Sequence, residues 1–187
     1  EINRLSSKSF NRNDGHYYYR PRIFLHELKE VVEHHNIIVT TACLAGPIAA
    51  NLPSDGDELE ITTHKRAVLD EWIALAKDNP DYIYLEVQPH NIEEQKKLNK
   101  VLVHYADQYG LKLIAANDIH ALNPTHDKLR KIIQKGKGSK YEDEGLELWC
   151  KDRNEMIKSF KLQGVLTDAQ INNALDLTVD VVHRVQD

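Results

Sequence analysis

An aspartate and a histidine stand two residues apart after a short apolar run, in the sequence LIAANDIH over residues 113–120. In extended chain, side chains two residues apart point to the same side, so Asp118 and His120 are expected to face one space. A carboxylate and an imidazole that share a space can bind a divalent metal ion. A polar loop after a strand is the simpler interpretation of the same residues.

Two further polar clusters stand where other apolar runs end. Cys43 ends the run IIVTTAC, and Glu86, Gln88 and His90 lie in the sequence YLEVQPH. A Cys43 thiolate could join the aspartate–histidine pair as a third metal ligand. Each residue also has a structural interpretation: Cys43 could fill the core, Glu86 could pair with a lysine or arginine, and His90 could be an exposed turn residue. The residue types alone leave both interpretations open.

The other histidines and the second cysteine show no spacing typical of a metal site. Cys43 and Cys150 form no CxxC pair, so neither a disulfide framework nor a thiolate zinc knuckle is indicated. The remaining eight histidines share no common spacing and are predicted to lie on the surface: His16, His26, His34, His35, His64, His104, His126 and His183.

Predicted helices and strands alternate along the first two thirds of the chain. Apolar residues recur at helical spacing over residues 23–35, 63–77 and 92–109. Apolar or β-branched runs predict strands over residues 37–43, 82–88 and 113–116, the first of them buried on both faces. This alternation is typical of parallel β/α architecture, either a barrel or an open sheet. In such folds ligands bind at the carboxyl ends of the strands, where all three polar clusters stand.

Local signals predict the helix ends. Gly110 is expected in the left-handed conformation that ends the helix over residues 92–109. Three predicted capping boxes start helices: Asn91 with Glu94, Asp152 with Glu155, and Thr167 with Gln170. Leu175, Val179 and Val182 are expected to form the apolar side of the last helix.

The bulk composition limits the class of protein. With 187 residues, 41% of them hydrophobic, the chain can build one sizeable core with at most one appended element. A net charge of −5 argues against binding nucleic acid through an overall positive field. No apolar stretch of about 18 residues and no signal peptide occur, so we expect a cytoplasmic protein without membrane contact. The chain starts without Met, which suggests a piece of a longer protein.

Four segments together resemble one known family. TACLAG, YLEVQPHNIEEQKKLN, GLKLIAANDIHALNPTHDKL and LWCKDRNEM, in this order and spacing, resemble the PHP (polymerase and histidinol phosphatase) domain of bacterial and phage replicative DNA polymerase III alpha subunits. The resemblance covers residues 3–185. It implies an α/β fold in which residues 1–135 are the carboxyl-terminal portion of a PHP-type (β/α)7 barrel. Residues 136–187 would be a helical connector towards the polymerase palm.

The resemblance also implies a function. In family members that keep the full ligand set, the barrel mouth holds zinc or manganese and supports 3′ to 5′ exonuclease activity on DNA. Cys43 matches the metal-binding cysteine of the family, and Asp118 and His120 match its Asp-x-His ligand pair, which would also be catalytic. The expected partners are DNA, through the complete polymerase, other replisome subunits, and the remainder of the alpha chain.

Several parts of the family pattern do not occur in these residues. The H-x-H pair and four further ligands of the family are missing, and Pro47 stands where the family often has Glu. The catalytic carboxylates of the palm are also missing, so these residues alone are expected to be inactive as a DNA polymerase. Two alternatives are a non-catalytic structural PHP module and a stand-alone phosphoesterase of the histidinol-phosphatase type. The tail over residues 136–187 argues against the phosphoesterase.

Overall fold

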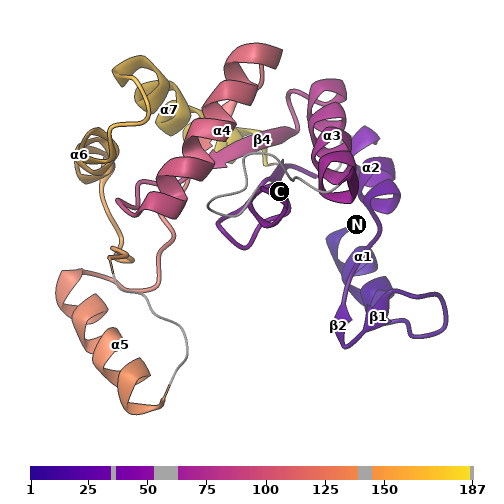
Figure 1. Ribbon diagram of the computed structural model, residues 1–187, viewed down its shortest axis with the longest axis horizontal. Helices are drawn as coiled ribbons and strands as arrows, with labels where there is room; N and C mark the ends of the chain where they lie inside the picture. Colours follow the sequence, from indigo (N-terminus) through magenta and orange to yellow (C-terminus); the bar gives the residue numbers. More distant parts are fainter. Residues whose placement is uncertain (35–36, 53–62, 139–144, 186–187) are drawn as a thin grey trace.

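The computed structural model describes residues 1–34, 37–52, 63–138 and 145–185 (Figure 1). The helices are α1 (Ile2–Ser9), α2 (Leu25–Glu33), α3 (Thr63–Asp78), α4 (Glu93–Tyr109), α5 (Pro124–Gly136), α6 (Arg153–Gln163) and α7 (Asp168–Arg184), with a 3-10 turn at Ala49–Asn51. The strands are β1 (Tyr17–Tyr18), β2 (Arg20–Pro21), β3 (Val39–Thr40), β4 (Ile83–Val87) and β5 (Leu113–Ala115). In Figure 1 the helices α3, α4 and α7 lie around β4 with α6 next to α7, while α5 and the β1–β2 hairpin extend away from the strand.

A small parallel sheet carries the strands that the sequence analysis predicts. Its order is β3-β4-β5, with Thr40 opposite Tyr84 and Leu85 opposite Leu113. The parallel β/α arrangement is therefore confirmed, while a closed barrel stays a prediction. Strand β3 is shorter than predicted, and Val39 and Thr40 are only half-buried. The expectation of burial on both faces is wrong there, because among the described residues β3 pairs only with β4.

One hydrophobic core joins the sheet to helices from both ends of the chain. Leu85 on β4, Leu102 on α4, Phe160 on α6 and Ile171 on α7 are all fully buried in it. Helix α7 packs against β5. Burial of such side chains contributes about 1.5–3 kcal/mol each. Residues of α6 and α7 thus share the core of the sheet, while the predicted boundary at residue 136 stays a prediction.

Two of the three predicted capping boxes are confirmed. Asp152 accepts from the amide of Glu155 at 2.9 Å, and Thr167 accepts from the amide of Gln170 at 3.2 Å. Gly110 is left-handed, with φ 68°, as predicted. The capping box at Asn91 is wrong. The N-cap of α4 is the next residue along the chain, which makes no side-chain capping hydrogen bond, so Asn91 stands one position too early.

The apolar side predicted for the last helix is only partly buried. Leu175 is 7% exposed, but Val179 and Val182 are 50% and 68% exposed. The three residues of β5 span about 10 Å, whereas the 17 residues of α7 span about 25 Å. The final turns of α7 therefore extend past the strand that covers its first half.

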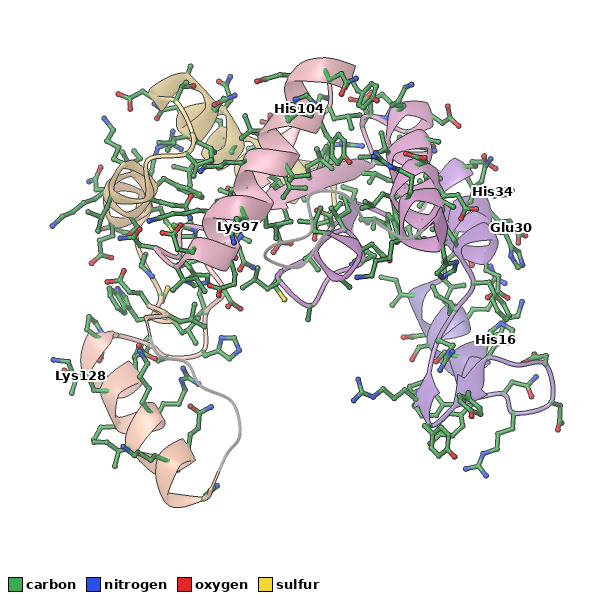
Figure 2. The ribbon with its side chains drawn as sticks, in the orientation of Figure 1. His16, Glu30, His34, Lys97, His104 and Lys128 are labelled. Atoms are coloured by element: carbon green, nitrogen blue, oxygen red, sulfur yellow. The ribbon has the colours of Figure 1, made fainter. Side chains whose placement is uncertain are left out.

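His16 is buried, which corrects the prediction that it lies on the surface. Its side chain, labelled in Figure 2, is held between the carboxylates of Asp14 and Glu27, with Nε2 2.8 Å from Oε1 of Glu27. Lys8 of α1 forms an ion pair with the same Glu27. Charge pairing offsets the cost of burying the imidazole. The cluster joins α1, the segment before β1, and α2.

The other histidines agree with the prediction where the structure describes them. His26, His34, His64, His104, His126 and His183 are exposed. His35 lies outside the described residues.

The charges of this cluster depend on one another. Burial opposes the charge of Glu27, but hydrogen bonds from the Lys8 ammonium and the Phe24 amide outweigh it and lower the pKa of Glu27 to about 2. Hydrogen bonds to Asp14 and Glu27 raise the pKa of His16. Glu27 therefore stabilises the fold above its ordinary pKa of 4.5 and less so as the pH falls towards 2. His16 stabilises it below 6.5 and less so as the pH rises through its raised pKa.

We expect the midpoint of thermal unfolding to be highest near pH 5 to 6 and to fall on the alkaline side as His16 loses its proton. Glu27→Gln should lower this midpoint most near pH 5 to 6 and flatten its fall at alkaline pH. The measurement is thermal unfolding followed by circular dichroism from pH 4 to 9. Glu33→Gln, on the exposed side of α2, is the control and should keep the original profile. Parallel profiles for the two variants would contradict the assignment.

Candidate functional site

The carboxylate of Asp118 lies between two imidazoles just beyond β5. Its Oδ2 is 3.3 Å from Nε2 of His90, and its Oδ1 is 3.5 Å from Nδ1 of His120. His90 follows β4 and His120 follows β5, so the parallel strands bring the three side chains to one end of the sheet. The convergence of Asp118 with His120 agrees with the sequence analysis. For His90 the sequence left two interpretations open, a residue of the site or an exposed turn residue.

A turn, rather than extended chain, brings Asp118 and His120 together. Asp118 has φ 54°, in the left-handed region that aspartate tolerates better than most residues. Nδ1 of His120 also lies 3.1 Å from the carbonyl oxygen of Asp118. The strand ends at Ala115, three residues before the aspartate. The expectation that these two residues continue an extended strand is therefore wrong. Their side chains nevertheless lie close together, as predicted.

His90 is buried, with 2% of its surface exposed, which excludes the exposed turn. Its approach to Asp118 is within ion-pair range, yet neither ring nitrogen makes a well-aligned hydrogen bond to any residue that the structure describes. Burial lowers the pKa of His90, against the opposing effect of the Asp118 carboxylate. The ring is therefore mostly neutral near pH 7, the form in which an imidazole nitrogen can bind a metal ion.

A buried amide network fixes the backbone on which His90 stands. Nε2 of Gln163, on α6, donates to the carbonyl oxygens of Gln88 and His90 at 2.9 and 2.7 Å. Nδ2 of Asn99, on α4, donates to the same Gln88 carbonyl at 2.8 Å and to Oε1 of Gln163 at 2.7 Å. The sequence alone did not predict this network. Its signal is Asn99 and Gln95, polar residues four apart next to the apolar stripe of α4, and both are fully buried.

Glu86 is held by internal hydrogen bonds. Oγ1 of Thr40 donates to Oε2 of Glu86 at 2.6 Å, and Nε2 of Gln88 donates to its Oε1 at 2.9 Å. Neither contact involves the lysine or arginine that the structural interpretation suggested. The contact with Thr40 joins β3 to β4, and the contact with Gln88 lies within the segment that continues β4, so both carboxylate oxygens serve internal hydrogen bonds.

Cys43 lies in a tight turn after β3. Ala42 has φ 58°, and a Cβ atom on Gly46 would lie 2.3 Å from the carbonyl oxygen of Thr41, so only glycine fits there. Cys43 is half-buried rather than a core residue. Within residues 1–34, 37–52, 63–138 and 145–185, no three His, Cys, Asp or Glu residues are grouped so that they could hold a metal ion. The ligand set of Cys43, Asp118 and His120 therefore stays a prediction.

A buried lysine lies behind the cluster. The side chain of Lys151 is 1% exposed, lies 4.2 Å over the ring of Trp149, and donates to the carbonyl oxygen of Glu147 at 2.6 Å. Burial lowers the pKa of Lys151, and the carboxylate of Glu147 opposes this. The carbonyl of Lys151 accepts from Nδ2 of Asn117 at 3.2 Å. The burial of Lys151 is not predictable from the sequence, because the residue stands between two exposed residues and carries no periodic signal.

Two more polar atoms of this region are buried without a partner. Among the described residues, Oδ1 of Asn117 accepts no hydrogen bond and Nε1 of Trp149 donates none. Buried polar atoms are normally paired, with protein, water or a bound group. Together with the ring nitrogens of His90, they give this region unused hydrogen-bonding capacity among the described residues.

Curated relatives align with most or all of this chain. It is 31% identical to the DNA polymerase III subunit alpha of Borreliella burgdorferi over 192 aligned residues, which are 99% of this chain and 15% of that protein. It is 39% identical to the subunit from Aquifex aeolicus and 36% identical to that from Deinococcus radiodurans, over 58% and 63% of this chain. In both cases the alignment covers 8% of the relative.

The chain is thus similar to one segment of the alpha subunits of DNA polymerase III, between about a twelfth and a seventh of their length. No protein-family model matches the chain. The assignment of this segment to a PHP domain stays a prediction.

Gln163→Leu should destabilise the protein by about 1–3 kcal/mol, because it leaves the buried carbonyl of His90 without its side-chain donor and removes the acceptor of Asn99, while the Gln88 carbonyl keeps only Asn99. Urea unfolding followed by fluorescence measures the free energy of unfolding. Gln108→Leu, on an exposed position of α4, is the matched control and should change it by less than about 0.5 kcal/mol. Equal effects of the two substitutions would show that the network does not hold the loop.

Proposed function

We propose that this chain forms part of a replicative DNA polymerase alpha subunit and contributes metal ligands to a phosphoesterase site with 3′ to 5′ exonuclease activity on DNA. The observation that carries the proposal is the convergence of His90 and His120 on the Asp118 carboxylate. It lies at the carboxyl ends of neighbouring parallel strands, where β/α folds bind ligands. The similarity to DNA polymerase III alpha subunits supports the first part of the proposal, that the chain is part of a polymerase alpha subunit.

The donor set suits a divalent metal ion. Cys43, Asp118 and His120 would supply a thiolate, a carboxylate and an imidazole, which suit zinc, and the oxygen and nitrogen donors also suit manganese. The unpartnered nitrogens of buried His90 are further support for a bound group. The described residues do not close a site by themselves, so the remaining ligands would come from outside the described residues. A bound metal supplies a hydroxide at neutral pH and stabilises charge on the phosphate.

The residues of this chain have distinct parts in the proposal. Asp118 is the central ligand and has 27% of its side chain exposed, so one side of it remains accessible. His120, with half of its side chain exposed, is placed to meet a phosphodiester entering from solvent. His90 is a positioning residue, because its buried ring lies against Oδ2 of Asp118 and limits where the carboxylate can turn.

A second candidate function is a non-catalytic structural module of the same polymerase subunit. The hydrogen bonds of Glu86 favour it, because both oxygens of this carboxylate at a strand end already accept hydrogen bonds from within the protein. The absence of a three-ligand group among the described residues is compatible with it. Both candidates share the proposed partners, namely DNA, the remainder of the alpha chain and other replisome subunits, and a cytoplasmic location. No helix in the described part of the chain is long and apolar enough to cross a membrane.

Asp118→Asn in the complete polymerase polypeptide separates the two candidates. If the metal site exists, the loss of a charged ligand should weaken zinc or manganese binding at least about tenfold. Exonuclease activity on a single-stranded DNA end should fall about a hundredfold or more, while nucleotide incorporation continues. Metal content is measured by mass spectrometry of the purified protein and affinity by calorimetry.

Asp70→Asn, an exposed position on α3, is the control and should leave metal content and both activities unchanged. If Asp118→Asn also leaves metal content and exonuclease activity at the level of this control, the metal site is wrong and the structural module is the better description.

A further inference from the structure

Helix α5 contacts its own chain through its polar side. Asp127 is 3% exposed and accepts from Nη2 of Arg130 at 3.2 Å, with Nζ of Lys131 at 3.3 Å. Nζ of Lys131 also donates to the carbonyl oxygen of Leu146 at 2.6 Å. Asp127 is the only buried residue of the helix. Figure 1 shows α5 standing apart from the helices that surround the sheet.

The apolar side of α5 faces solvent. Leu129, Ile132 and Ile133, the α5 apolar face, are 53%, 67% and 56% exposed. Their spacing of three and four residues places them on one stripe. Ile119 and Leu122, in the segment before the helix, are 56% and 69% exposed. An amphipathic helix normally buries its apolar stripe against its own protein, so the orientation of α5 is the reverse of the usual one.

Exposed lysines flank this stripe on both sides. With 3.6 residues per turn, Lys128 and Lys135 lie beside Ile132, and Lys137 lies beyond Ile133 on the other side. None of the three lysines forms an ion pair with another residue in the described ranges. Figure 2 shows Lys128 at the outer side of α5, away from the sheet. The face therefore combines aliphatic side chains in its centre with positive charge at its rim that has no ion-pair partner in the described part of the chain.

We propose that the α5 apolar face docks an amphipathic helix of a partner protein whose own apolar stripe is flanked by aspartate and glutamate. The aliphatic centre requires an apolar surface in return, and the lysines require carboxylates. The 13 residues of α5 span about 20 Å, which gives a ridge of three to four turns for a helix of similar length. So small a contact is of the size found in weak, transient complexes.

The same chemistry disfavours other occupants. A second copy of α5 would place lysine against lysine around the stripe. DNA would pair with the lysines but leave the leucine and isoleucines in water. An anionic membrane would match both features, but α5 has no Trp, Phe or Tyr and exposes only three large aliphatic side chains, which makes a poor interfacial anchor.

Two synthetic helical peptides test the proposal. Both carry the same leucine stripe, and they differ only in having glutamates or lysines beside it. The complete polymerase polypeptide that contains this chain should bind the glutamate peptide with a micromolar Kd by fluorescence anisotropy and the lysine peptide at least tenfold more weakly. Raising the salt concentration from 50 to 500 mM should weaken the glutamate complex several-fold, since the rim contacts are exposed to solvent.

Substitutions on α5 localise the binding. Leu129→Asp with Ile133→Asp should weaken binding of the glutamate peptide at least tenfold without lowering the thermal midpoint, because both side chains are exposed. Lys128→Glu with Lys135→Glu should reverse the preference in favour of the lysine peptide. Val182→Asp, at an equally exposed position on α7, is the control and should change nothing.

Four results would overturn the proposal. They are no binding of either peptide up to millimolar concentration, equal binding of both, or unchanged binding by the α5 variants. The fourth is binding of the protein to phosphatidylserine vesicles, or its self-association in sedimentation. Either would overturn the proposal if the α5 apolar substitutions abolish it and neither peptide competes with it.

Discussion

The backbone hydrogen bonds of β4 to both of its neighbours are the constraint on which the rest of the structure depends. The amide of Thr41 donates to the carbonyl of Tyr84 at 3.1 Å, and the amide of Leu85 donates to that of Lys112 at 3.0 Å. The amide of Ala116 donates to Val87 at 3.0 Å beyond the last residue of β5. Because the pairing is parallel, the residues that follow each strand emerge at one end. Asp118 and His90 meet for this reason.

The loop that carries His90 depends on distant parts of the chain. Gln163 lies more than seventy residues away, yet its side-chain amide satisfies the carbonyls of Gln88 and His90. An unsatisfied buried carbonyl costs more than a typical hydrogen bond gains, so such a network is either complete or destabilising. The helix α6 is thus as much a part of the site as the strands are. A polar interior of this kind fixes one backbone path where apolar packing alone would allow several.

Two polar clusters of the chain differ in how completely they are satisfied. His16 has a carboxylate on each ring nitrogen, so the cluster at the amino-terminal end closes on itself and joins α1 to α2. His90 is equally buried, but its ring nitrogens lack an aligned partner, as does Oδ1 of Asn117. The first arrangement serves stability. The second leaves hydrogen-bonding capacity for a group that the protein would bind. The α5 apolar face is likewise unoccupied among the described residues, but it offers apolar surface instead of hydrogen bonds.

The sequence by itself determined the order of helices and parallel strands, the caps at Asp152 and Thr167, and the pairing of Asp118 with His120. These features follow from hydrophobic periodicity and from side chains that act within a few residues, which is information that a linear chain carries. Only the tertiary structure decided that His90 and His16 are buried, that Glu86 is used up by Thr40 and Gln88, and that α5 turns its apolar side to solvent. Each depends on contacts between residues far apart in the chain, or on which side of a helix meets the core, and neither is encoded in local spacing.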